Sequence, residues 1–140
     1  MASLVYNHCL DNLVRGTVDF DTDTFKVMLV TSSYTPDQDT HEFRSSVTNE
    51  VGNSGTYASG GSTSAATVTK DDTNNRIDIS FDSVNWTGAT ITARAAVIYK
   101  SRGGAASADE LVAYVDFLGD VTSSNGTFTV TFTSPLRFQN

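Results

Sequence analysis

The stretch Ile91–Phe117, ITARAAVIYKSRGGAASADELVAYVDF, contains the two segments that decide the predicted fold. Its first part begins with alternating apolar and polar side chains and ends in the apolar run Ala95–Tyr99, a pattern typical of a strand that enters a buried region. Its last part alternates with the period of two that a sheet requires, with one face made of Leu111, Ala113, Val115 and Phe117. We therefore predict a central antiparallel pair of strands.

The connection between these strands, Ser101–Glu110, is longer than a tight hairpin turn. Its Gly103-Gly104 pair favours a flexible backbone. Long glycine-bearing loops are frequent sites of contact with a partner. We predict that Lys100 and Arg102, which flank the flexible part, bind acidic groups of a partner.

The chain before the central pair predicts one helix and several short strands. The segment Leu4–Arg15 has apolar residues at helical spacing, and Gly16 follows where helices commonly end. A glycine-rich segment, residues 49–64, predicts an irregular loop anchored by Tyr57. Strands are predicted at Phe25–Thr31, Ala65–Lys70, Arg76–Phe81, Val84–Trp86 and Thr127–Thr133, the last after an Asn125-Gly126 turn.

This pattern predicts a single mainly β domain spanning residues 1–140. Seven or eight short strands bounded by turn residues indicate an antiparallel β-sandwich or jelly roll with a short N-terminal helix. One or two helical turns are also expected within residues 39–46, where Phe43 is the one large apolar residue.

The composition restricts the partners. The chain has 9 basic and 16 acidic residues, a formal net charge of −7, which disfavours binding to nucleic acid or to an anionic membrane. No apolar run approaches the roughly 20 residues of a membrane span. The first twelve residues lack a basic cluster, so no signal peptide is expected, and the single Cys9 predicts synthesis in a reducing compartment.

The sequence contains little that predicts a metal site. Asp19, Asp21 and Asp23 begin like a calcium loop, but Thr24 and Val30 occupy the glycine and glutamate positions. On an extended strand the three carboxylates share a face, where they form a weak site for a hard cation or, as we favour, a solvated acidic edge. His8 and His41 have no metal-ligand spacing, and we predict no metal and no cofactor.

Catalytic motifs are also missing from the sequence. The chain has no glycine-flanked serine elbow, no phosphate-binding glycine loop and no dinucleotide fingerprint. We predict that it is not an enzyme, while a hydrolase with two acids that converge only in the fold stays an alternative. Arg94, inside a central strand, is expected to be a paired structural arginine.

Several residues are candidates for contact with other proteins. The tail Ser134–Asn140 carries more apolar weight than a frayed terminus needs, and residues 1–6 also offer aliphatic and aromatic side chains. Either terminus docks on a neighbouring chain or simply closes the end of a sheet. Together with the two basic residues at the loop, the predicted partner-binding set is Tyr6, Tyr34, Phe43, Lys100, Arg102, Arg137 and Phe138.

The chain resembles a family of small proteins from tailed bacteriophages. The resemblance rests on five framework segments, namely Phe25–Ser32, Thr48–Val51 with the Tyr57 segment, Thr90–Arg94, Val97–Lys100 and Gly126–Phe132. Some members are head decoration, or cement, proteins, small β-sandwich or jelly-roll subunits that bind and reinforce the outside of the capsid lattice. The resemblance supplies no catalytic motif and no individual site residue.

The resemblance implies a structural virion protein that is made in the host cytoplasm and placed on the capsid exterior. Its expected partners are the major capsid protein and a second copy of itself, in a homodimer. The alternative is a tail or fibre component that binds a host surface molecule.

Overall fold

The computed structural model describes residues 2–140 as a mainly β protein with two antiparallel sheets and one short helix near the N-terminus. This confirms the predicted sandwich architecture. Two short 3-10 helices lie at Arg44–Ser46 and Ala106–Ala108. The helix and strands are β1 (Leu4–Val5), α1 (Asn7–Val14), β2 (Phe25–Val30), β3 (Ser62–Thr63), β4 (Ala66–Asp71), β5 (Arg76–Phe81), β6 (Val84–Lys100), β7 (Leu111–Val130) and β8 (Leu136–Gln139).

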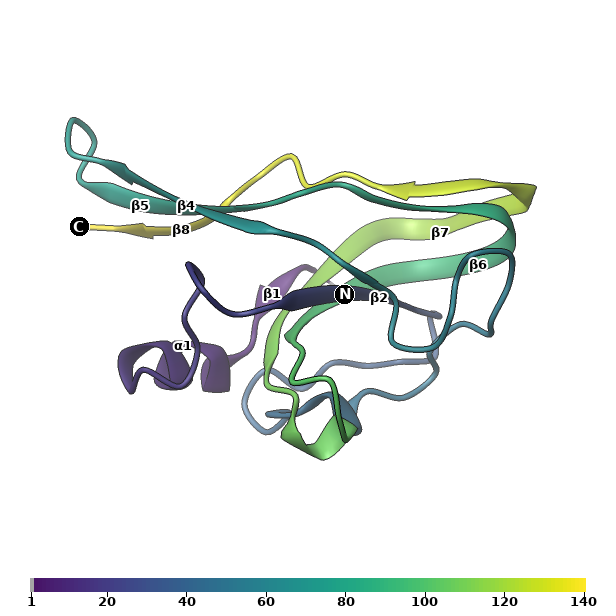
Figure 1. Cartoon of the computed structure of the whole chain (residues 1–140), viewed down its shortest axis with the longest axis horizontal. Helices are drawn as coiled ribbons and strands as arrows, with labels where there is room; N and C mark the ends of the chain where they lie inside the picture. The colour runs from purple at the N-terminus through teal and green to yellow at the C-terminus, as the bar shows by residue number, and fades with distance from the viewer. Residues whose placement is uncertain (1) are drawn as a thin grey trace.

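The strands form two layers. One sheet has the order β1-β7-β6-β2-β3 and the other has the order β4-β5-β8. Figure 1 shows that the ribbon made by β6 and β7 bends at one end of the molecule, so that its outer part continues the line of β5 and β8. The long hairpin therefore belongs to both layers and joins them.

Strands β6 and β7 are continuous and longer than predicted, so the predicted strand boundaries were wrong. The expected separate strands at Val84–Trp86 and Thr127–Thr133 are the outer ends of the central pair, with Trp86 opposite Phe128. Gly88 and Asn125 have φ angles of 58° and 45°, and the register shifts beside them. Bulges let a ladder bend without ending, so the predicted Asn125-Gly126 turn is a bend within β7.

The five-stranded sheet is buried on both faces over its central part. One face packs on the other sheet through residues such as Leu29, Ile98 and Trp86. The other face carries a second cluster that includes Met28 and Val97 and is covered by the segment around Tyr34 and Val47. Burial on both faces explains the continuous apolar runs in β2 and β6, as the sequence predicts for both strands.

A bulge interrupts the predicted alternation of side chains between the two faces of β7. The register with β6 shifts between Ile98 and Tyr99. As a result, Leu111 packs in the cluster of Tyr114, whereas Val112 joins the opposite face. The prediction that Leu111 shares a face with Ala113 was therefore wrong.

The N-terminal helix is shorter than predicted. Leu4 and Val5 pair with β7 as β1, and the helix covers Asn7–Val14. Its buried side includes Cys9, but Leu10 and Val14 are exposed, so the predicted apolar stripe is only partly buried. Gly16 has a φ of 78°, the left-handed conformation expected just after a helix. The predicted turns within residues 39–46 reduce to the 3-10 turn at Arg44–Ser46.

Candidate functional site

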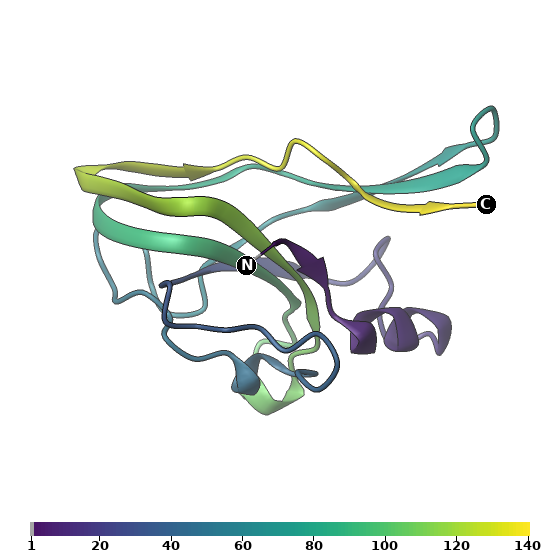
Figure 2. The same ribbon diagram turned by 180° about the vertical axis from the view of Figure 1, so that it is seen from behind.

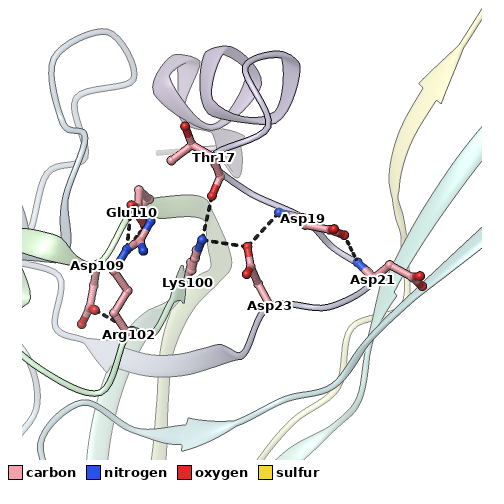
Figure 3. A network of polar contacts seen from close by, with 8 residues as sticks. All are labelled: Thr17, Asp19, Asp21, Asp23, Lys100, Arg102, Asp109 and Glu110. Carbon is pink, nitrogen blue, oxygen red and sulfur yellow. Dashed lines mark hydrogen bonds and ion pairs between the residues drawn. The ribbon is translucent and has the colours of Figure 1, made fainter.

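The loop 101–110, predicted as a flexible contact loop, is held by ion pairs within the chain (Figure 3). Arg102 donates from Nη2 to Oε1 of Glu110 at 2.6 Å, and its amide donates to Asp109 Oδ1 at 2.9 Å. The second oxygen of Asp109 accepts from Nε of Arg44 at 2.9 Å. Both carboxylates are buried. Charge-assisted hydrogen bonds of this kind fix the loop to the body of the protein.

Lys100 connects the same region to the acidic segment after α1. Its Nζ lies 2.9 Å from Oδ2 of Asp23 and donates to the carbonyl of Thr17 at 2.6 Å. The amide of Asp19 donates to the same Asp23 oxygen, and the amide of Asp21 donates to Asp19. The acids therefore lie in a turn, and Asp23 is the one that contacts Lys100, whereas Asp21 points away from it (Figure 3). The prediction that they share one face of an extended strand was wrong.

Three of the predicted partner-binding side chains lie inside the protein. Tyr6 and Tyr34 are buried, and their hydroxyl groups form a 2.9 Å hydrogen bond. Tyr34 is also bonded to Nδ1 of His41 at 2.9 Å. Burial raises the pKa of Tyr6 far above its usual range, so the phenol stays neutral. Lys100 is 8% exposed, and all three side chains already contact groups of their own chain.

The other four predicted residues fall into two separated groups. Phe43, half-buried, and the more exposed Arg102 lie beside the 101–110 loop. Arg137 and Phe138 lie on β8, where Arg137 makes hydrogen bonds of 2.7 and 2.9 Å to Asp78. β8 pairs with β5, just as β1 pairs with β7. Both described termini thus close sheet edges, while Met1 lies outside the described residues.

An apolar groove lies between α1 with its following turn and the projecting three-stranded sheet. Figures 1 and 2 show the helix beneath the free end of β4, β5 and β8 from opposite sides. The groove has a volume of about 550 Å³. We call this surface the helix–sheet groove; its apolar residues are Leu13, Val18, Phe20, Val68, Ile77, Ile79 and Phe138, and Asp19 and Asp21 also line it.

The helix–sheet groove exposes side chains that a folded monomer usually covers. Val68 in the groove is 39% exposed, and on α1, outside the groove lining, Leu10 and Val14 are 39% and 86% exposed. Phe138 and Ile77 are half-buried on the inner face of the sheet. Contiguous apolar surface rimmed by polar residues is typical of a protein-binding site.

Of these residues, the sequence predicted only Phe138 as a contact. The helix contains two apolar pairs at a spacing of four, Cys9 with Leu13 and Leu10 with Val14. These four positions form an ordinary amphipathic stripe, so nothing in the sequence indicated that Leu10 and Val14 are exposed. Val68 carried no signal either, because its exposure depends on how far the hairpin projects.

Arg94 is the paired structural arginine that the sequence predicts. Its Nε donates to Oδ1 of Asp116 at 2.8 Å, and the Asp116 side chain is 1% exposed. This hydrogen bond lowers the pKa of Asp116. Burial raises the pKa of the Cys9 thiol to about 12, so the thiol is protonated at neutral pH and is a poor nucleophile.

Within residues 2–140, no group of three or more His, Cys, Asp or Glu side chains is arranged to hold a metal ion. No helix in that range is long and apolar enough to cross a membrane. Comparison of the chain with family models, curated proteins and solved structures gives no match.

Proposed function

We propose that this chain is a structural virion protein that binds the outside of a bacteriophage capsid and stabilises its lattice. In this proposal the helix–sheet groove contacts the major capsid protein, and the chain self-associates as a homodimer. The observation that carries the proposal is the exposed apolar surface of the groove, where Val68 is 39% exposed and Ile77 and Phe138 are only half-buried. We choose the major capsid protein as the partner because the framework segments resemble those of phage decoration proteins.

The groove is suited to holding another protein in a fixed orientation. The sheet that forms one wall is hydrogen-bonded through all three strands, and Ile79 anchors it in the core. Burying exposed apolar side chains there contributes roughly 25 cal/mol per Å² before the costs of association. A modest affinity per copy is sufficient on a capsid, because many copies on one lattice bind with multivalency.

The charges around the groove suit a protein partner. At the free end of the sheet, Lys70 pairs with Asp72 and Arg76 with Asp71, each at 3.0 Å. Arg137 pairs with Asp78 on the same sheet. These pairs leave the sheet wall of the groove close to neutral, whereas Asp19 and Asp21 line the facing wall. The sheet wall is therefore the side on which an acidic partner meets the least repulsion.

Cosedimentation with capsids tests the proposed surface. Capsids of the phage that encodes this chain are prepared without it and mixed with the purified protein. We expect saturable binding, weakened at least about tenfold by Val68→Lys, because a lysine at the groove must be desolvated. Thr67→Lys is the matched control, since neighbouring residues of a strand point to opposite faces and Thr67 is exposed.

Electron cryo-microscopy of intact virions tests the location. The proposal requires density for this sandwich on the capsid exterior. Density on the tail instead would support the alternative of a tail or fibre component. Virions without the chain at either place would remove both.

A further inference from the structure

The outer edge of β7 is open along most of its length. β1 pairs only with Ala113 and Tyr114 of β7, and the amide of Asp116 donates to the side chain of Ser3. Beyond that point, no strand within residues 2–140 other than β6 pairs with β7. An edge of this kind presents free amide and carbonyl groups to any strand that aligns with it.

This open edge lacks the usual protection against strand addition. The segment Val121–Val130, VTSSNGTFTV, contains no charged residue and no proline. Natural proteins usually place lysine, proline or other charged residues on exposed edges. The edges of the three-stranded sheet follow that rule, because β4 ends in Lys70 and Asp71 and β8 contains Arg137.

The hydrogen bonds to β6 show which amides of β7 point outward. The amide of Ile91 donates to the side chain of Ser123, so Ile91 faces β7, and Ser123 is the residue opposite it in the register. Opposite residues of an antiparallel pair face the same way relative to each other, so the backbone groups of Ser123 face β6, as does the amide of Asn125, which donates to Thr90. Because this direction alternates along an antiparallel strand, the amides of Thr122 and Ser124 point to the open edge.

A bulge places an exposed leucine next to the open edge. The register moves from Ala93 opposite Val121 to Ala95 opposite Asp116, so the residues between them on β7 project as a bulge. At its tip Leu118 is 83% exposed and has a φ of 68°. A leucine in the left-handed region is unfavourable, and an exposed one gains nothing from burial within its own chain. Val121 beside it is 42% exposed.

We infer that β7 pairs antiparallel with β7 of a second copy of this chain. A twofold axis at Thr122 pairs this residue with Thr122 of the other copy and continues the five-stranded sheet from one copy into the other. This register places Asp120 of one copy opposite Ser124 of the other, so no two carboxylates are paired directly. Leu118 and Val121 then pack against the adjoining copy.

A second copy is the occupant that the charges favour. Each copy carries a net charge of −7, so two copies repel one another over most of their surfaces. The uncharged Val121–Val130 segment is a surface where equal copies approach without placing like charges together. The inference specifies the self-association that the proposed function includes, but it concerns the purified chain alone.

Sedimentation equilibrium of the purified full-length chain tests the inference. We expect the wild type to be a dimer. Thr122→Pro removes the outward amide without removing a hydrogen bond to β6, and each dimer loses this donor twice. The dissociation constant should rise at least about tenfold. Thr122→Ala keeps the amide and is the matched control, which should remain dimeric.

A second pair of variants separates edge pairing from a local effect of proline. Val121→Lys should weaken the dimer, because the two added lysines lie diagonally across the axis on the same face of the joined sheet. Thr69→Lys adds the same charge to the exposed outer face of β4 and should not weaken it. Far-ultraviolet circular dichroism shows whether each variant keeps its sheet.

A monomeric wild type would overturn the inference, as would a dimer that survives both Thr122→Pro and Val121→Lys with folding intact. If the wild type is monomeric alone and Val121→Lys loses only capsid binding, the edge pairs with the capsid protein, and the inferred second copy is wrong. A dimer broken by both variants supports the inference whether or not capsids bind the chain, so it can stand or fall separately from the proposed function.

Discussion

The two edges of the five-stranded sheet differ in how far other segments of the chain cover them. The chain seals the β2 edge with its own segment 49–63, in which Val51 donates its amide to Leu29 and Ser62 pairs with Val27. Within residues 2–140, the β7 edge is covered near its start, over residues 112–116, by β1 and by hydrogen bonds to Tyr6 and Ser3. One edge is thus closed within the monomer, and the other is left to solvent or to a partner.

This difference shows what a segment needs in order to cover a sheet edge of its own chain. Segment 49–63 approaches β2 closely at Gly61 and is held by the hydroxyl of buried Tyr57, which donates to half-buried Glu50. Its glycine-rich sequence serves close packing rather than mobility. β7 has no such segment, and its open part is uncharged from Val121 onward. An edge sealed this way is structural, whereas an unsealed neutral edge is suited to recognition.

The largest effect is expected where the sealing segment touches β2. A Cβ added at Gly61 would lie 1.7 Å from the carbonyl oxygen of Val27, and Gly61 has a φ of 75°. Both the backbone clash and the left-handed conformation oppose a side chain. We predict that Gly61→Ala lowers the free energy of unfolding by about 3 to 5 kcal/mol, measured by urea denaturation.

The matched control lies at the open edge. A Cβ at Gly119 in the β7 bulge meets nothing within 4 Å, and this glycine has no positive φ. Gly119→Ala should change the free energy of unfolding by no more than about 0.5 kcal/mol. Equal losses at Gly61 and Gly119 would contradict the distinction between the two edges.

The next effect tests the polar anchor of the seal. The Tyr57 hydroxyl accepts the amide of Leu29 at 3.0 Å and donates to Oε1 of Glu50 at 2.8 Å. Tyr57→Phe leaves the buried Leu29 amide without its acceptor. We expect a loss of about 2 kcal/mol in the free energy of unfolding and faster hydrogen exchange at Leu29. A loss below about 0.5 kcal/mol would show that water replaces the hydroxyl.

The ion pair at the base of the open-edge bulge predicts a pH dependence. The Arg94 hydrogen bond lowers the pKa of Asp116 below its ordinary value. The charged Asp116 therefore stabilises the fold above the unfolded-state pKa of about 3.9, and this contribution is lost as the pH falls through the lower folded-state pKa. Asp116→Asn should cost about 1.5 kcal/mol at neutral pH.

Urea unfolding from neutral pH down to about pH 3 measures this dependence. The gap between wild type and Asp116→Asn should be constant at higher pH and should narrow below about pH 4. Asp72→Asn is the control, because Asp72 and its partner Lys70 are both largely exposed and such pairs contribute little. A gap that stays constant down to the lowest pH would contradict the role of the Asp116 charge.

Local patterns in the sequence correctly predicted the strands that have a clear side-chain pattern and lie between clear turn residues. The hairpin of β4 and β5 lies within one residue of its predicted bounds, and β2 matches its apolar run. Tyr57 was also correctly predicted as the anchor of the glycine-rich segment. These features depend on side-chain periodicity and turn residues, which neighbouring residues in the sequence determine.

The remaining features depend on contacts between distant residues. Lys100 reaches the carbonyl of Thr17 across 83 positions, and no local pattern indicates that pairing. The bends in β6 and β7 looked like strand ends, because Gly88 and Asn125-Gly126 are also common in turns. The groove lined by Leu13 and Val68 likewise depends on the relative positions of two elements.

The smallest effect separates stability from recognition at the open edge. Leu118 is held at a φ of 68° with its side chain 83% exposed, and asparagine tolerates this conformation better than leucine. Leu118→Asn should therefore raise the free energy of unfolding of the monomer by about 0.5 to 1 kcal/mol, measured at concentrations below the dimer dissociation constant. The same change removes an apolar contact of the inferred dimer, so self-association should weaken while the fold becomes more stable. That result would indicate that the leucine at position 118 serves the contact with the second copy and not the stability of its own chain. A variant that loses stability without losing self-association would show instead that the Leu118 side chain supports its own chain.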